Sequence, residues 1–589
     1  MKLRSLKSAL GAMLEIACLG GVAGLCQLAL CPPAEAQDYD RYRPNPPVTL
    51  PHLPCLPSLP QAPIEGSTDI IVESLRGVFV VDHECRIQDP IAAFDGIRID
   101  PAAELTVARE DGFKEAIQPY IGQPVSIRML NEMARNIVLL YRDARQPVVD
   151  ISMPPGQDIT DGIVQIIITE SRIGAVRFAG NCWFDTCMLE EQSCLRPGQL
   201  IYEPWLEQEL VWYNKNPFRD VDVNLVPGAA PGTTDVVYQV REQRPVRAFA
   251  GYENSGVRTT SIDRLLFGVH WGNAGGRDQQ FSYQYTTDAH LSGVIGVHSF
   301  AYEAPIFENR DSWMMYGSWT DIDTTLGGIP NTQATAWQWS GRYRHTLCEN
   351  ECRLDRMYFG FDTKGTNSDL DFGGNTVVDN RVEIVQLTAG LSSWQQYSDG
   401  VTRYAFDGFL SPGHLLGRNN TADFKTLRPG AVSTYLYARG WVERLYEIDC
   451  RHDLVVRATG QLSTNKLLPI EQLGFGGYNT VRGYDMRTAN GDAGYLLNAE
   501  YRTKPIISCV HGRESSLTLL TFADAGVPYQ YGTVANQVDG KLLASVGVGA
   551  RYLIDPNCTI RFDYGVPLHD VGPNYHSAGR VHIGAVFAY

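Results

Sequence analysis

A chain of 589 residues is too long for one ordinary hydrophobic core, so its length predicts two to four domains. Its formal net charge of −16 argues against nucleic acid as a partner. For an exported chain, 56 glycines and 29 tyrosines with only 20 % charged residues favour a β-barrel over a soluble protein.

The first 36 residues are predicted to be a signal peptide. They begin with the basic residues Lys2, Arg4 and Lys7, which an apolar run to Leu30 follows. Ala34–Ala36 then fits a small-x-small cleavage site. An uncleaved membrane anchor is the alternative. No later stretch reaches the roughly 18 uninterrupted apolar residues that a membrane helix needs. Residues 37–66 are rich in proline and are predicted to be an extended linker.

Residues 67–243 indicate two consecutive β-α-α-β-β modules, over 67–171 and 172–243. In the first module, a strand at 77–82 precedes a long helix that Ser126 caps. Two further strands, at 147–153 and 163–170, close this module. The second module is predicted to contain a strand, two helices and two strands, at 173–180, 185–195, 204–214, 220–226 and 233–242.

From residue 244 to residue 589 the helical period disappears and an alternation of period two replaces it. Short turns such as "NAGG" and "DPNC" alternate with long polar loops, an asymmetry typical of bacterial outer-membrane barrels. The segments can be laid out as sixteen strands. The predicted fold class is therefore a transmembrane antiparallel β-barrel of sixteen strands, preceded by two α+β modules.

Strand parity predicts which side chains face the lumen of this barrel. Phe522, Asp524 and Gly526 share one face of a strand, and Leu519 lies on the other. Because a carboxylate that faces lipid is costly, Asp524 is predicted to point inward. The last strand ends on the aromatic Tyr589, which resembles the recognition signal of outer-membrane barrels.

The cysteines are predicted to form disulfides, because an exported chain meets an oxidising compartment. The ten candidates are Cys55, Cys85, Cys182, Cys187, Cys194, Cys348, Cys352, Cys450, Cys509 and Cys558. Zinc binding is the alternative, but Cys182, Cys187 and Cys194 lie near no histidine. The five barrel cysteines fall in or beside short turns, so a bridge such as Cys509 with Cys558 is one option among several.

Together these features resemble the TpsB family, the outer-membrane transporters of two-partner secretion. The resemblance covers nearly all of the chain after residue 66. The stretches that carry it are, in chain order, "GQDITDGIVQIIITES", "NKNPFRDVDVNLVPG", "GTTDVVYQVRE", "GYENSG", "FGGYNTVRGY" and "FADAG". The resemblance implies that the two modules are periplasmic POTRA domains and that the barrel lies in the bacterial outer membrane.

The resemblance also implies a functional loop at about residues 468–492, which folds back into the barrel lumen. Its motif comprises Val481, Arg482, Gly483 and Tyr484. Arg482 is expected to bind Asp524 beside Phe522, and Gly526 is expected to leave room for the loop backbone. A solvated external loop is the alternative. Some family members have an N-terminal plug helix, which the prolines of residues 37–66 disfavour, so pore closure is expected to depend on the loop.

A secreted TpsA-type exoprotein, held unfolded in the periplasm, is the partner that the resemblance implies. An extended client segment is expected to add as a strand to the edge of a POTRA sheet. The predicted contacts are Asp220, Val221, Asp222, Val223, Asn224 and Leu225. We expect no metal or other cofactor, no nucleotide hydrolysis, and a monomeric barrel surrounded by outer-membrane lipid.

Three other functions remain as alternatives. A BamA-type assembly factor shares the loop and the POTRA domains, but such chains usually have more modules and are longer. A passive porin would explain the barrel and leave the two modules without a role. An enzyme is disfavoured, because lumenal carboxylates such as Glu500 and Asp563 are normal in water-filled barrels. The predicted function is export of an unfolded exoprotein across the outer membrane without ATP.

Overall fold

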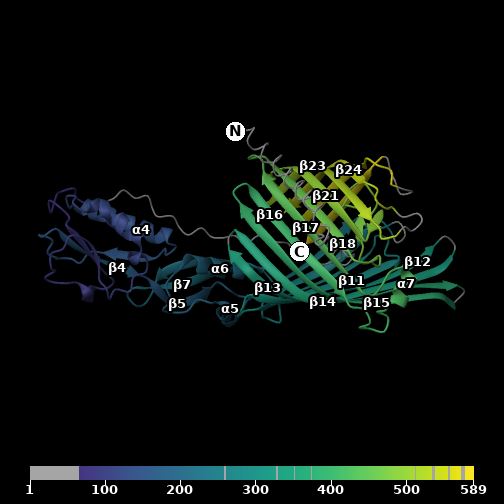
Figure 1. Cartoon of the computed structure of the whole chain (residues 1–589), viewed down its shortest axis with the longest axis horizontal. Coiled ribbons are helices and arrows are strands. Elements are labelled where there is room, and N and C mark those ends of the chain that lie inside the picture. The colour runs from purple at the N-terminus through teal and green to yellow at the C-terminus, as the bar shows by residue number, and fades with distance from the viewer. Residues whose placement is uncertain are drawn as a thin grey trace. The chain divides into compact units, whose positions relative to one another are not determined.

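The computed structural model describes residues 65–257, 261–326, 329–350, 352–372, 375–510, 512–532, 538–554, 558–571 and 578–589 (Figure 1). The predicted signal peptide, nearly all of the proline-rich linker and Cys55 lie outside these residues. The described chain divides into two compact units, with the boundary between Gln243 and Arg244. Within the described residues, every helix is too short or too polar to span a bilayer.

The first module packs helices on a four-stranded sheet. Its elements are β1 (Gly77–Val81), η1 (Glu84–Arg86), β2 (Gly96–Ile99), η2 (Val107–Arg109), α3 (Asp111–Ile117), η3 (Gln118–Tyr120), α4 (Ile127–Asp143), β3 (Val149–Ser152) and β4 (Ile163–Glu170). The sheet order is β2-β1-β4-β3. As predicted, Ser126 caps α4, because its Oγ accepts a hydrogen bond from the Met129 N–H at 3.2 Å. Met133 and Ile137 on this helix are fully buried in the core.

The second module is smaller and has a three-stranded sheet. Its elements are β5 (Arg172–Ala179), α5 (Thr186–Gln192), α6 (Glu203–Tyr213), β6 (Arg219–Pro227) and β7 (Thr233–Glu242). The sheet order is β5-β7-β6, so β7 is central and β6 forms an edge. Leu206 and Leu210 of α6 are buried, as are Val236 and Tyr238 of β7, and these side chains belong to the hydrophobic core of the module.

The residues after Gln243 form a closed antiparallel barrel. Its strands are β8 (Val246–Glu253), β9 (Arg264–Ala274), β10 (Gln279–Asp288), β11 (Ile295–Ile306), β12 (Asp311–Leu326), β13 (Ile329–Asn350), β14 (Arg353–Phe372), β15 (Asn375–Tyr397), β16 (Gly400–Ser411), β17 (Tyr435–Glu447), β18 (His452–Ser463), β21 (Ala493–Thr503), β22 (Ile506–Val510), β23 (Arg513–Tyr529), β24 (Leu543–Ile554), β25 (Cys558–Pro567) and β26 (Arg580–Ala588). Strands β21 and β22 pair in succession with β23, so they count as one, and the described barrel has sixteen strands.

The barrel wall is apolar outside and polar inside. On β21, Tyr495 and Leu497 are 54 % and 45 % exposed, although both are large apolar side chains. On β23, Leu519 is 45 % exposed while Asp524, on the opposite face, is 2 % exposed. A soluble sandwich would bury the apolar face, whereas a membrane barrel turns it toward lipid. This inverted pattern, together with the closed ring, identifies a membrane barrel.

Two long connections pack against the inner face of the wall. Loop 5, residues 412–434, contains helix α7 (Thr421–Leu427), whose Phe424 is buried against Val382 and Ile384 of β15. Loop 6, residues 464–492, contains a small hairpin of β19 (Leu473–Phe475) and β20 (Ala489–Gly491). The sequence analysis did not predict α7, and it predicted the inward course of loop 6 but not that of loop 5.

All nine described cysteines are free thiols in the structure. The sequence analysis gave a bridge between Cys509 and Cys558 as one option. Cys509 lies on β22 and Cys558 on β25, and strands β23 and β24 lie between them. Three inter-strand spacings amount to about 14 Å, whereas the Cα atoms of a disulfide lie within about 7 Å. That bridge is therefore wrong, and the other pairings stay predictions.

Candidate functional site

Loop 6 makes a tight turn at the motif that the sequence analysis identified. Gly476, Gly477 and Gly483 have φ angles of +101°, +110° and +89°, which residues with a Cβ rarely adopt. At Gly483 the available space matters as well, since an added Cβ would lie 2.8 Å from the carbonyl carbon of Gly565 on β25. The Gly483 N–H also donates to Nε2 of His582 on β26 at 3.1 Å. The motif thus lies directly against the wall.

Arg482 is 3 % exposed and forms a bidentate pair with Asp524 of β23. Its Nε and Nη2 donate to the two carboxylate oxygens at 2.7 and 2.8 Å. Its backbone N–H donates to the same carboxylate at 3.1 Å. The planar guanidinium suits this geometry because it presents two parallel donors. The structure therefore brings together the two residues that were predicted to meet.

Arg482 has two further acidic partners that the sequence analysis did not assign to it, and it also contacts Phe522, which the analysis placed beside it. Its Nη1 donates to Glu500 of β21 at 2.6 Å and lies 3.4 Å from a carboxylate oxygen of Asp563 on β25. Its guanidinium carbon lies 3.5 Å from the centre of the Phe522 ring, close enough for a cation–π contact. Strand parity had already placed both acids on polar faces, and no local pattern linked them to the loop.

Each carboxylate that contacts Arg482 is paired with at least one guanidinium group. Glu500 also accepts from Arg502 at 2.7 Å, and Asp563 accepts from Arg551 at 2.9 Å. With Asp524 and Arg482, the cluster contains three carboxylates and three guanidinium groups. Buried charges are tolerated when they are paired in this way. Removal of Arg482 leaves the buried Asp524 carboxylate without a guanidinium partner.

The other predicted loop residues also contact the wall. Val481 is fully buried, and the Tyr484 hydroxyl group lies 3.1 Å from the carbonyl oxygen of Ala544 and 2.8 Å from that of His569. Gly526 was expected to leave room for the loop backbone. This expectation is wrong in detail, since an added Cβ at Gly526 would lie 2.9 Å from the ring of Phe475. The space beside Gly526 is occupied by the side chain of Phe475 from loop 6, and not by the loop backbone.

The predicted client contacts lie on β6, at the edge of the second module's sheet. The side chains of Asp220 and Asp222 accept hydrogen bonds from Nη2 of Arg241 on β7, at 2.8 and 2.9 Å. The hydrogen bond to Asp220 is the main reason why the pKa of Arg241 is raised. These acids therefore support the sheet from one face.

The outer backbone of β6 is open beyond Val221. The N–H and C=O groups of Val221 both bond to the side chain of Asn214, at 2.7 and 3.0 Å, so they point away from β7. In an antiparallel strand this orientation recurs at every second residue. Val223 and Leu225 consequently direct their N–H and C=O groups outward, and together they form what we call the β6 edge.

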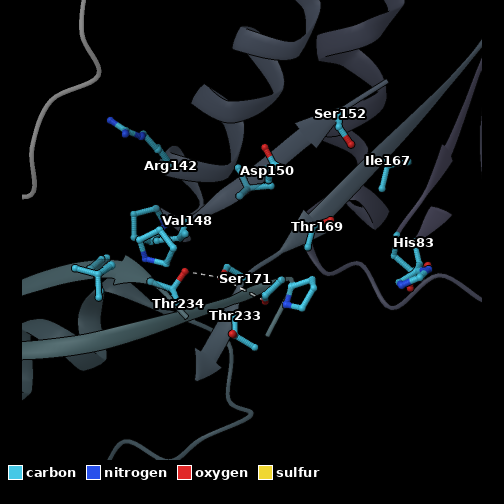
Figure 2. A pocket seen from close by; sticks show the side chains of 18 of the residues that line it. His83, Arg142, Val148, Asp150, Ser152, Ile167, Thr169, Ser171, Thr233 and Thr234 are labelled. Atoms are coloured by element: carbon cyan, nitrogen blue, oxygen red, sulfur yellow. Dashed lines mark hydrogen bonds between the residues drawn. The ribbon is translucent and has the colours of Figure 1, made fainter. Parts of the chain in front are cut away.

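A cleft of about 1160 Å³ lies beside this edge, between the sheets of the two modules (Figure 2). Asp150 and Ser152 of β3, itself an edge strand, line it on one side. Leu225 and the residues that follow it line the other side. Ser171 and Thr234 join the two modules by a hydroxyl–hydroxyl hydrogen bond of 2.7 Å. The cleft therefore adjoins two sheet edges of the POTRA-like region.

Comparison with known proteins agrees with this architecture. A family model described as "Haemolysin secretion/activation protein ShlB/FhaC/HecB" matches residues 232–552, more than half of the chain. The heme/hemopexin transporter protein HuxB of Haemophilus influenzae is 20 % identical over 487 residues, covering 78 % of this chain and 80 % of the relative. The outer membrane transporter CdiB of Escherichia coli is 21 % identical over 500 residues, covering 79 % of each chain.

Solved structures show the same fold. CdiB from Escherichia coli superimposes with a TM-score of 0.66 at 17 % identity and covers 91 % of this chain and 93 % of its own. BamA from Haemophilus ducreyi reaches a TM-score of 0.51 at 13 % identity, with 82 % and 99 % covered. The family match and the transporter relatives favour secretion over barrel assembly. The chain belongs to the ShlB/FhaC/HecB family of haemolysin secretion and activation proteins, outer-membrane transporters of two-partner secretion with periplasmic POTRA domains.

Proposed function

We propose that this transporter captures an unfolded, TpsA-type exoprotein at the β6 edge and exports it through a pore that loop 6 gates. The protein acts as a monomer surrounded by outer-membrane lipid. The observation that carries the proposal is the buried, bidentate contact of Arg482 with Asp524. This contact fastens a loop that occupies the lumen through which the client must pass.

The gate is held by charge pairing. Removing one partner of a buried ion pair leaves the other charge desolvated, at a cost on the order of 3–5 kcal/mol. The pair therefore fixes loop 6 in one position at rest. A client segment that enters the lumen must displace the loop or move along it, and the loop returns when the segment has passed.

Capture uses backbone hydrogen bonds. The outward N–H and C=O groups of Val223 and Leu225 offer an extended client the pairing that a neighbouring strand would provide. Such bonds give affinity without strict demands on client sequence. The neighbouring cleft provides space for client side chains. Folding of the client outside the cell gives the process its direction, so no nucleotide hydrolysis is required.

The client is identified by deleting the transporter and comparing the secreted proteins by mass spectrometry. We expect one large exoprotein, or very few, to disappear from the medium while other outer-membrane barrels keep their abundance. Arg482→Ala and Asp524→Ala should each reduce export of that protein without preventing barrel insertion. Arg344→Ala is the matched control, because its ion pair with Glu303, at 2.8 Å, joins two wall strands. Normal export in both loop-site variants would refute the gate.

A further inference from the structure

Loop 6 has a second buried ionic contact with the wall. The Glu471 carboxylate accepts a hydrogen bond from Nζ of Lys364 on β14 at 2.7 Å, and both side chains are 0 % exposed. Neither residue belongs to the glycine-rich turn around Arg482, and the sequence analysis singled out neither of them. A fully buried pair of charges is costly unless its geometry is good, so its presence on a loop calls for a role.

Other wall strands hold the same glutamate. The second carboxylate oxygen of Glu471 accepts from the Tyr437 hydroxyl group at 2.5 Å. Its backbone carbonyl accepts from Arg439 of β17 at 3.1 Å and from Gln461 of β18 at 3.2 Å. One loop residue is thus fixed by strands β14, β17 and β18 together. This attachment is as extensive as the one around Arg482.

The two attachments lie on different arcs of the ring. In the closed order of sixteen strands, Glu471 is held by the seventh, tenth and eleventh strands, β14, β17 and β18. Arg482 and Gly483 contact the twelfth, thirteenth, fifteenth and sixteenth strands, β21, β23, β25 and β26. Loop 6 is therefore attached to two separate sectors of the wall.

The segment around Glu471 is also tied to loop 5. Asp492, at the end of loop 6, accepts from the Leu467 N–H at 2.9 Å and from Nη2 of Arg428 in loop 5 at 2.8 Å. Arg428 donates in addition to the backbone carbonyl of Leu467 and to Gln530. Both ends of loop 6 and the end of α7 form one connected body. This body touches β14 through Glu471.

We propose that Lys364 and Glu471 form a second latch of loop 6, independent of the Arg482 site, and that the pore opens fully only when both are released. The inference rests on the proposed gating role of loop 6. Because the loop is attached to the wall at two separate sites, release at one site leaves it attached at the other. Lys364 is in this sense a positioning residue for the gate.

The test measures the time-averaged conductance of the purified full-length protein in planar lipid bilayers, with no client present. The variants are Lys364→Met, Glu471→Gln, their combination, Arg482→Ala, and Lys364→Met with Arg482→Ala. We expect either change at the second latch to raise the conductance about tenfold, since one buried charge loses its partner. Arg344→Ala, which removes an ion pair between two wall strands, should leave the conductance unchanged.

The conductances of the double variants, compared with those of the single variants, distinguish a specific latch from general loosening of the barrel. Lys364→Met with Glu471→Gln should conduct no more than either single variant, because both belong to one contact. Lys364→Met with Arg482→Ala should exceed both single variants, because the contacts are separate. Should Lys364→Met fail to fold, Glu471→Gln carries the test, since it preserves the side-chain shape.

The second latch is overturned if Glu471→Gln stays within about twofold of the wild-type conductance, well below the effect of stranding a buried charge. It is also overturned if the variant with both sites changed conducts no more than Arg482→Ala alone. Since these measurements use no client, their failure leaves the export function intact. A loss of client export, conversely, reports on the proposed function and leaves the latch result unaffected.

Discussion

Gly483 and Gly565 meet backbone to backbone, and this contact sets how closely loop 6 approaches β25. An added Cβ at Gly565 would lie 2.6 Å from the Gly483 nitrogen, and one at Gly483 would lie 2.8 Å from the Gly565 carbonyl carbon. Both distances are shorter than real Cβ contacts. The position of Arg482, the neighbouring residue, depends on this approach.

Gly483→Ala should therefore displace the turn and weaken the Arg482 contacts. The alanine would have to adopt a φ near +89°, which costs on the order of 1–3 kcal/mol, and it would also push against β25. We expect reduced client export and a lower melting temperature of the barrel. Gly276→Ala is the control, since Gly276 has a φ of +72° and nothing within 4 Å of an added Cβ. Equal losses in both variants would mean that backbone strain alone is responsible.

The sequence was sufficient to predict the pairing of Arg482 with Asp524 but not the full charge cluster. The motif located the arginine, and strand parity placed Asp524 on the lumenal face. Strand parity also placed Glu500 and Asp563 on the lumenal face. Parity predicts which face of a strand a side chain occupies, but it does not predict which residue of the loop that side chain contacts. The strands that a long loop contacts are determined by how the barrel closes in three dimensions. For the same reason, the Phe475 ring against Gly526 was not foreseen.

At the scale of elements, the β6 edge offers a clear experiment. The Val223 N–H points away from β7, so replacing it by the ring of proline removes a donor from the open side of the sheet. Val223→Pro should keep the module folded and lower the affinity for the exported client several-fold, as expected for the loss of a backbone bond of about 1 kcal/mol. Pull-down of the client by the full-length transporter measures this.

A second variant separates backbone from side chain at the same position. Val223→Thr keeps the N–H group and the branched shape, so it should bind the client as the wild type does. Weaker binding by Val223→Thr, or unchanged binding by Val223→Pro, would argue against strand addition at this edge. Circular dichroism of both variants checks that the β content is retained.

Elements with a long regular period were predictable, and short ones were not. The strands at 163–170 and 233–242 and the helix after Ser126 appear where the pattern placed them. Strand β2 has four residues and helices α3 and α7 have seven each, too few to show a period of 2 or 3.6. Helix α7 is fixed instead by burial of Phe424 in the barrel mouth, which only the folded ring provides.

At the scale of the whole molecule, the ring closes through a short seam. Strands β26 and β8 pair from Gly584 with Glu253 to Ala588 with Phe249. Beyond this ladder, the backbones of Ala248 and Tyr589 exchange two hydrogen bonds, at 2.9 and 2.8 Å. The Tyr589 side chain is 97 % exposed, so the protein itself gains little from packing it. Backbone and side chain of the last residue therefore have separable roles.

Deletion of Tyr589 should destabilise the closed barrel, because it removes both hydrogen bonds from the end of the seam. Each contributes about 1 kcal/mol net, so the temperature at which the folded band is lost in heat-modifiability gels should fall. Tyr589→Ala keeps the backbone and should melt like the wild type. If the terminal aromatic ring is the insertion signal, Tyr589→Ala should nevertheless lower the amount of barrel in the outer membrane, while Tyr589→Phe should not. A deletion variant that melts at the wild-type temperature would show that the seam does not depend on its last residue.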